Sequence, residues 1–157
     1  MTDNIYSAPE SNINEVSEGD DAIMQFPRFS AWAVFGLGII TLGIYTLFWF
    51  YNRLTVVNKN HTKPIAMGLF WAYIALSVLS NGMSFSESWM LFASLFTVAG
   101  MIVYFVMIYT LRARLIDLIE SAEVTNLSKI GGVMTFFFSI IYLQFKINEA
   151  IDAKNQS

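Results

Sequence analysis

The 157-residue sequence contains no cysteine, a single histidine and few charged residues. Without cysteine the chain offers no disulfide, no thiolate metal ligand and no thiol nucleophile. The histidine, His61, lies in the run NKNHTKP beside lysines and not beside carboxylates, so we expect no metal site there. Charged residues make up 13% of the chain, against about 25% in soluble proteins. The sequence therefore predicts no metal, no cofactor and no enzyme active site.

Apolar residues are abundant instead. Hydrophobic residues make up 55% of the chain, and its mean hydropathy is +0.53. A soluble domain of this length could not bury so much apolar surface, so we expect lipid to be the solvent. The net charge of −3 arises from residues 1–25, which hold six acidic residues and no basic one. We interpret residues 1–25 as a disordered acidic tail, 26–152 as a helical membrane domain and 153–157 as a C-terminal tail. No dense basic patch indicates a nucleic-acid partner.

Four apolar segments lie at about 29–51, 64–83, 89–111 and 130–147. As a helix, the first would be about 34 Å long, enough to cross a hydrocarbon core of about 30 Å. The sequence thus predicts an all-α, polytopic membrane protein with about four transmembrane helices. The strongly apolar parts of the second and fourth segments are short, which leaves tilted, interfacial and re-entrant arrangements open for both.

The run RARLIDLIESAEV, residues 112–124, has apolar residues on one helical face and charged residues largely opposite. It predicts a short amphipathic helix after the third segment, lying on the membrane or packing on the bundle. A plain extension of the third span explains the pattern equally well.

Basic residues in short loops resist translocation and thereby set the orientation of the spans. With four spans, six basic residues would lie on one side and three on the other, which predicts cytoplasmic long connections and both termini outside. The six are Arg53, Lys59, Lys63, Arg112, Arg114 and Lys129, and the three are Arg28, Lys146 and Lys154.

No charged residue lies inside the four apolar cores, the fourth of which ends at Phe145, before Lys146. This counts against a coupled transporter and against an intramembrane enzyme. Small residues recur at helical spacing, and in lipid such positions allow the close backbone approach that drives helix association. Gly43 is also a point at which a helix can bend. The candidate packing or break residues are Gly36, Gly43, Gly68, Ala72, Ala93, Thr97 and Gly100.

Both ends of the membrane domain carry a recognisable pattern. Near the start stands an apolar run followed by Thr41, Leu42, Gly43, Ile44, Tyr45 and Trp49, and near the end stand Tyr142, Leu143, Gln144, Lys146, Ile147 and Asn148. Over about 26–152 the chain resembles a bacterial family of small integral membrane proteins, the domain of unknown function numbered four-two-three-four. The resemblance implies a bacterial multi-pass membrane protein and brings no activity, cofactor or catalytic residue. It draws attention to Gln144 and Asn148, spaced four apart, which either hydrogen-bond another helix or a headgroup or are simply interfacial.

Together these observations predict a small protein of the bacterial inner membrane that acts through helix–helix association, as an assembly, regulatory or scaffold component. Its partners would be the lipid bilayer and either a second copy or another membrane protein. The alternative is a channel or uncoupled transporter formed by oligomerisation.

Overall fold

The computed structural model describes residues 22–122, 124 and 127–156, and in these residues all regular secondary structure is helical. This confirms the predicted all-α class for the described residues. Most of the predicted acidic tail, residues 1–21, lies outside them. The elements are η1 (Ile23–Gln25), α1 (Ala31–Ile40), α2 (Ile44–Asn60), α3 (Met67–Met83), η2 (Glu87–Trp89), α4 (Met90–Ser121) and α5 (Gly132–Lys154).

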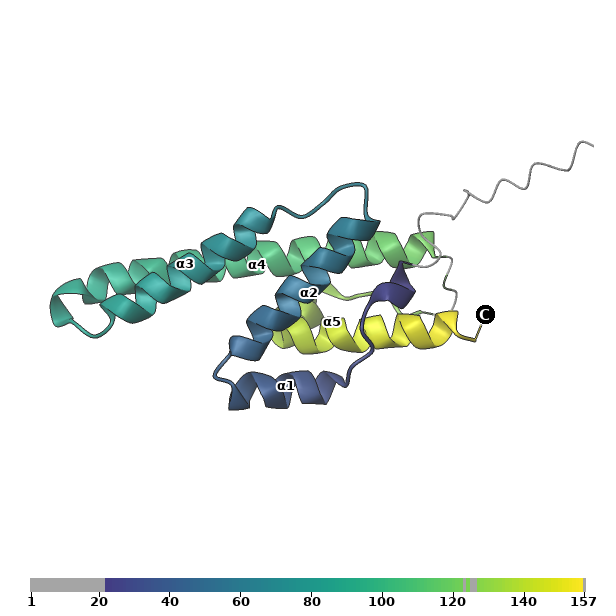
Figure 1. Ribbon diagram of the computed structural model, residues 1–157, viewed down its shortest axis with the longest axis horizontal. Coiled ribbons are helices and arrows are strands. Elements are labelled where there is room, and N and C mark those ends of the chain that lie inside the picture. Colours follow the sequence, from purple (N-terminus) through teal and green to yellow (C-terminus); the bar gives the residue numbers. More distant parts are fainter. Residues whose placement is uncertain (1–21, 123, 125–126, 157) are drawn as a thin grey trace, which may run out of the picture.

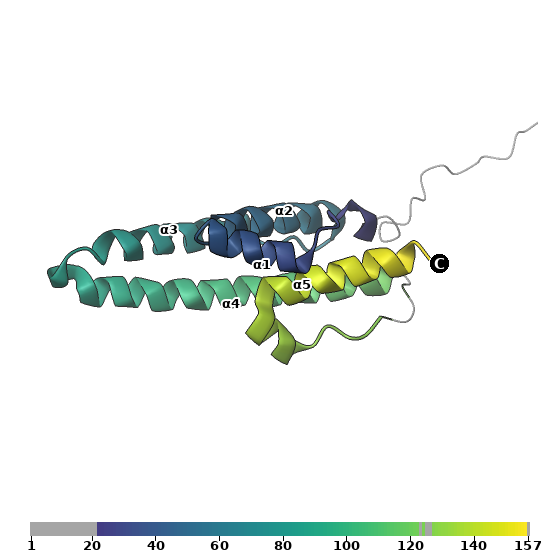
Figure 2. The same cartoon turned by 90° about the horizontal axis from the view of Figure 1, so that it is seen from below.

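Two helices form a long antiparallel hairpin that extends beyond the rest of the molecule (Figure 1). They are α3 and the first half of α4, joined by a short turn with η2, which we call the hairpin tip. The remaining helices gather beside the second half of α4, and we call this end the root (Figures 1 and 2). At 32 residues α4 is about 48 Å long, so it serves both the hairpin and the root.

The core of the protein lies at the root. Most of its fully buried side chains come from α2, the second half of α4 and the second half of α5, and they include Trp49, Phe50, Leu54, Leu111, Leu115, Leu143 and Ile147. Many large apolar side chains of α1, of the hairpin and of the first part of α5 remain exposed. The protein thus combines a packed root with an apolar surface that has no partner within the chain.

The first apolar segment, 29–51, is divided between α1 and α2. Leu42 and Gly43 both have positive φ, of 51° and 90°, and the N–H of Gly43 closes α1 by donating to the carbonyl of Gly38 at 2.7 Å. The N–H of Leu42 donates to Ile39, which completes the Schellman pattern that ends many helices. Glycine adopts positive φ without a Cβ penalty, so residue 43 is suited to the turn.

The other segments also differ in detail from the prediction. The run 112–124 continues α4 as far as Ser121, and its apolar face, with Leu115 and Leu118, is buried against the root. Of the two interpretations, the structure therefore shows a continuous helix that packs on the bundle. The fourth segment forms part of α5, which is broken at Ser139 (φ 38°, ψ −114°). Its first part turns away from the rest (Figure 2).

By length and composition, one helical stretch among the described residues, Glu87–Ser121, is long and apolar enough to cross a membrane. The helices α1 and α3 are apolar but shorter. One such stretch supports membrane association weakly, and it does not establish four crossings.

Candidate functional site

A cluster of polar side chains joins α2 and α5 inside the root. Trp49 and Arg53 lie four residues apart on α2 and therefore share a face. The side chain of Gln144 on α5 is completely buried between them. Its Oε1 accepts hydrogen bonds from Trp49 Nε1 at 2.8 Å and from Arg53 Nη2 at 2.6 Å. We call Trp49, Arg53, Gln144 and Asn148 the root cluster.

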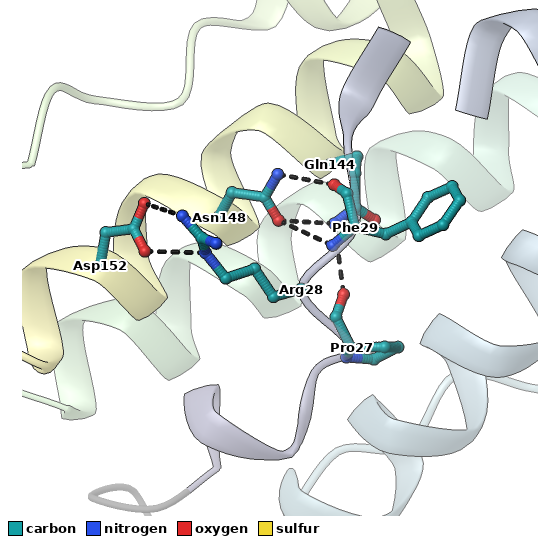
Figure 3. A network of polar contacts seen from close by, with 6 residues as sticks. All are labelled: Pro27, Arg28, Phe29, Gln144, Asn148 and Asp152. Carbon is teal, nitrogen blue, oxygen red and sulfur yellow. Dashed lines mark hydrogen bonds and ion pairs between the residues drawn. The ribbon is translucent and has the colours of Figure 1, made fainter. Parts of the chain in front are cut away.

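The amide nitrogen of Gln144 is used as fully as its oxygen. Nε2 donates to the carbonyl of Pro27 at 3.3 Å and to Asn148 Oδ1 at 2.9 Å (Figure 3). A glutamine amide offers two donors and one oxygen with two lone pairs, so every hydrogen-bonding position of Gln144 is occupied. A completely satisfied buried amide orders the elements that it joins, here α2, α5 and the segment before α1.

The segment before α1 is held along α5 in an extended conformation. Asn148 Nδ2 donates to the carbonyl of Phe29 at 2.7 Å, and Asn148 Oδ1 accepts from the N–H of Phe29 at 3.3 Å. One helical turn further, Arg28 makes a two-pronged ion pair with Asp152, at 2.9 and 3.0 Å (Figure 3). Gln144, Asn148 and Asp152 follow one another at intervals of four, so one face of α5 positions the chain before α1.

Arg53 is a buried cation held by neutral groups. Its side chain is 3% exposed, and among the described residues no carboxylate forms an ion pair with it. Its acceptors are Gln144 Oε1, the carbonyl of Pro27 and, at 3.5 Å, Asn52 Oδ1, while its guanidinium lies over the Trp49 ring at 5.1 Å. The Nε atom has no partner. Burial lowers the pKa of Arg53 from the usual arginine range to about 10, so the side chain stays charged at neutral pH.

A second polar feature is a hollow of about 450 Å³ between α3 and α4, which we call the hairpin hollow. It lies in the otherwise apolar hairpin. The residues that line it are Tyr73, Ser77, Ser80, Asn81, Ser84, Phe96, Thr97, Gly100, Met101 and Tyr104.

The serine, threonine and asparagine donors around the hairpin hollow are engaged within the hairpin. Ser77 Oγ donates to the carbonyl of Tyr73 at 2.8 Å, and Asn81 Nδ2 donates to the carbonyl of Ser77 at 2.7 Å. Ser80 Oγ lies 2.5 Å from Thr97 Oγ1 and thereby links α3 to α4. Because a hydroxyl or amide oxygen has two lone pairs, acceptor capacity remains on this surface after these bonds are made.

The structure brings together some of the small residues that the sequence singles out and separates others. Ala93 is buried against α3, and a Cβ at Gly100 would meet the Cβ of Leu76 at 3.7 Å. Thr97 contacts Ser80, so these three residues of α4 face α3. By contrast, a Cβ at Gly36 or Gly68 would have no atom within 4 Å. Ala72 is partly buried on α3, and Gly43 lies in the turn before α2.

His61 links the end of α2 to α4, because its Nε2 lies 3.0 Å from Asp117 Oδ2. Within the part of the chain that the structure describes, no group of three or more His, Cys, Asp or Glu side chains could hold a metal ion.

Sequence reasoning missed the part that Arg53 plays, because it treated this residue as a charge flanking the first span. The available signal was spacing. Trp49 and Arg53 on one segment, and Gln144, Asn148 and Asp152 on another, repeat every four residues, which places polar groups on one helical face in each. The sequence does not show that the two faces meet.

Comparison of the chain with known protein families, curated proteins and solved structures finds no match. The family resemblance seen near both ends of residues 26–152 therefore stays a prediction.

Proposed function

We propose that this chain is a membrane protein, anchored by the α3–α4 hairpin, that associates through the hairpin hollow with a second copy of itself. The observation that carries the proposal is a hollow lined by hydroxyl and amide groups in a surface that is otherwise apolar and exposed. Around it, Trp71, Leu95, Val98, Met101 and Ile102 are all more than half exposed.

The polarity of the hollow supports association and not simple anchoring. Lipid chains solvate Leu95 or Met101 as well as another helix would, so apolar residues alone bring no partner. Hydroxyl and amide groups, in contrast, gain a hydrogen bond only from a protein partner or water. Thr97, which is exposed, adds a small side chain at which a partner helix can approach closely. The role proposed is that of an assembly or scaffold component of the bacterial inner membrane, and the bacterial setting rests on the resemblance.

The test uses the absence of native cysteine. Asn81→Cys places a thiol at the hollow, and Leu79→Cys places one on the opposite side of α3, since two residues turn a helix by about 200°. Both positions are exposed. On oxidation in native membranes, we expect disulfide-linked dimers from N81C and several-fold fewer from L79C. Equal yields, or no dimer from either variant, would exclude self-association through the hollow.

A channel formed by several copies is the second candidate. It is favoured by the polar row on α3, where Tyr73, Ser77, Asn81 and Ser84 follow one helical face to the hairpin tip. Proteoliposomes distinguish the two functions. Ion or solute flux that Ser77→Leu abolishes would establish the channel. Disulfide-linked N81C dimers without any flux would exclude the channel and support the scaffold function.

A further inference from the structure

We propose that α1 and α2 form a re-entrant hairpin inserted into one leaflet of the bilayer, which enters and leaves on the side of the root. The surface concerned is the turn between the two helices, and its occupant is the lipid acyl chains. The inference rests on the membrane placement of the proposed function, and it adds a second lipid-inserted element and a definite orientation.

The chain before α1 and the chain after the turn are bonded to each other. Arg53 Nη2 donates to the carbonyl of Pro27 at 3.3 Å, and Asn60 Nδ2 donates to Gln25 Oε1 at 3.0 Å. A single crossing between residues 27 and 53 would place them on opposite sides of a hydrocarbon core about 30 Å thick. Residues held by these hydrogen bonds lie on the same side.

The length of α1 leads to the same conclusion. Its ten residues span about 15 Å, which is half of the hydrocarbon core. The turn then lies at mid-membrane depth, part of the way between the root and the hairpin tip (Figure 1). Three apolar side chains cover it and are largely exposed: Ile40 at 79%, Leu42 at 94% and Ile44 at 70%.

A turn at that depth needs its backbone groups paired, because lipid offers them no hydrogen bond. Each N–H from Thr41 to Thr46 has an acceptor within the turn. Thr41 closes the gap between the helices: its Oγ1 accepts from the N–H of Tyr45 at 2.9 Å and donates to the carbonyl of Leu37 at 2.7 Å. The N–H groups of the turn are thus satisfied internally, and its most exposed side chains are apolar.

Leu42 is the residue that singles out lipid as the occupant. It stands at the left-handed position of the helix end, which glycine normally takes, and its side chain contacts almost nothing in the chain. In water, this position would be unfavourable twice, because the backbone is strained and the leucine side chain is exposed to solvent. Acyl chains would compensate the strain by removing that side chain from water.

The first part of α5 lies next to this turn and has the same character. Just before the break at Ser139, Phe137 and Phe138 line one wall of an apolar groove, of about 310 Å³, whose other wall includes Phe35 and Ile39 of α1. Val133 and Phe137 are 71% and 72% exposed. We assign this part to the same leaflet, entering from the root without crossing.

The distribution of charge gives the orientation. Between Lys63 and Arg112 the sequence has a single charged residue, Glu87, at the hairpin tip. All nine basic residues of the chain belong to the root, where contacts such as Arg28 with Asp152 and Arg112 with Ile130 hold its segments together. Since basic residues stay in the cytoplasm, the root is cytoplasmic and the tip is outside. This arrangement differs from the four-span prediction, which placed both termini outside.

The test is topology mapping with single cysteines at exposed positions on the full-length chain. We would replace Met24, Thr62, Asn155 and Ser86 one at a time and treat intact and permeabilised cells with a membrane-impermeant maleimide. We expect M24C, T62C and N155C to label only after permeabilisation, and S86C to label in intact cells. If M24C and T62C label from opposite sides of the membrane while S86C labels from outside, the re-entrant hairpin is wrong and the α3–α4 anchor stands. If S86C and T62C label from the same side of the membrane, the α3–α4 hairpin does not cross it, and the proposed function is wrong as well.

A depth measurement tests the occupant. A fluorescent label on Leu42→Cys, in vesicles of phosphatidylethanolamine and phosphatidylglycerol, should be quenched several-fold more by lipids brominated in mid-chain than the same label on Thr62→Cys. Equal quenching at the two positions, or reaction of L42C with the impermeant maleimide in permeabilised cells, would overturn insertion of the turn.

Discussion

Arg53 shows how a single buried charge can be held by neutral groups. Removing such a charge from water has a large cost, and carbonyl and amide oxygens offset it only while they are all in place. Gln144 provides the shortest of these contacts and also accepts from Trp49. Replacing Gln144 should therefore lower the stability of the fold much more than replacing Arg53.

We expect Gln144→Leu to lower the free energy of unfolding by about 2–4 kcal/mol, because it leaves the buried guanidinium and the Trp49 N–H without their acceptor. Arg53→Met should have a smaller effect, since it removes the buried charge and leaves Gln144 bonded to Trp49. Unfolding in mild detergent, followed by circular dichroism, gives both values. In the double variant the two losses should not add, and strict additivity would contradict the coupling.

The lowered pKa of Arg53 makes a prediction about pH. Folding disfavours the charged form, so the cost of burying it is present below the folded pKa of about 10 and decreases as the pH rises from there toward the pKa of an unperturbed arginine. The stability of the wild type relative to Arg53→Met should thus be constant below pH about 10 and should increase above it. Unfolding of the two proteins side by side across this pH range measures the difference in their free energies of unfolding. If that difference already changes near neutral pH, a group other than Arg53 is titrating.

At the scale of elements, the α1–α2 turn is the point at which an unbroken apolar run in the sequence becomes two helices. Thr41, Leu42 and Gly43 are compatible with a continuous helix by hydropathy alone. The helix ends because the two positive-φ residues allow the terminal carbonyls to be satisfied locally, and because the hydrogen bonds of Pro27 with Arg53 and Gln144 hold the chain before α1 close to the middle of α2.

Two glycines test this turn against a matched control. A Cβ meets nothing within 4 Å at Gly43 or at Gly36, so the variants differ chiefly in backbone conformation. Gly43→Ala should lower the free energy of unfolding by about 1–2 kcal/mol, because φ is 90° there. Gly36→Ala, inside α1, should raise it by up to about 1 kcal/mol. Thermal unfolding in detergent measures both, and equal effects of the same sign would show that the turn is not strained.

At the scale of the whole molecule, polarity is separated along the long axis. The root contains the buried polar cluster and the basic residues, and the opposite end contains an apolar hairpin with Glu87 near its tip. A tip with so little charge crosses a bilayer at low cost, whereas basic residues there would resist translocation.

Adding basic residues to the tip should consequently disturb insertion. We expect Ser86→Lys with Ser88→Lys to leave a substantial fraction of the hairpin tips on the cytoplasmic side, while Ser86→Asp with Ser88→Asp should insert normally, since acidic residues contribute little to topology. Labelling of Ser84→Cys with the impermeant maleimide reports the side of the tip. Identical labelling in the two backgrounds would show that tip charge does not direct this protein.

Composition and spacing were sufficient for several features of the fold. The scarcity of charge and the apolar segments predicted helices, and glycine at position 43 marked a possible bend. The amphipathic run marked the apolar face of α4 with Leu115 and Leu118, but it left open whether that face meets lipid or the bundle. The site was predictable only in part. The resemblance drew attention to Gln144 and Asn148, and their spacing placed them on one helical face, but nothing in the sequence connected them to Arg53 or to the backbone of Pro27 and Phe29.

The sequence by itself thus determined the helical class, the apolar character and the positions of the polar residues along each helix, because these depend on side-chain type and local periodicity. Tertiary structure alone decided which faces meet. It folded α1 back on α2, brought the segment before α1 against α5 and gathered α1, α2 and α5 beside one half of α4. The physical reason is that a uniformly apolar segment fits a straight span and a hairpin equally well, and only hydrogen bonds between residues far apart in the chain distinguish the two.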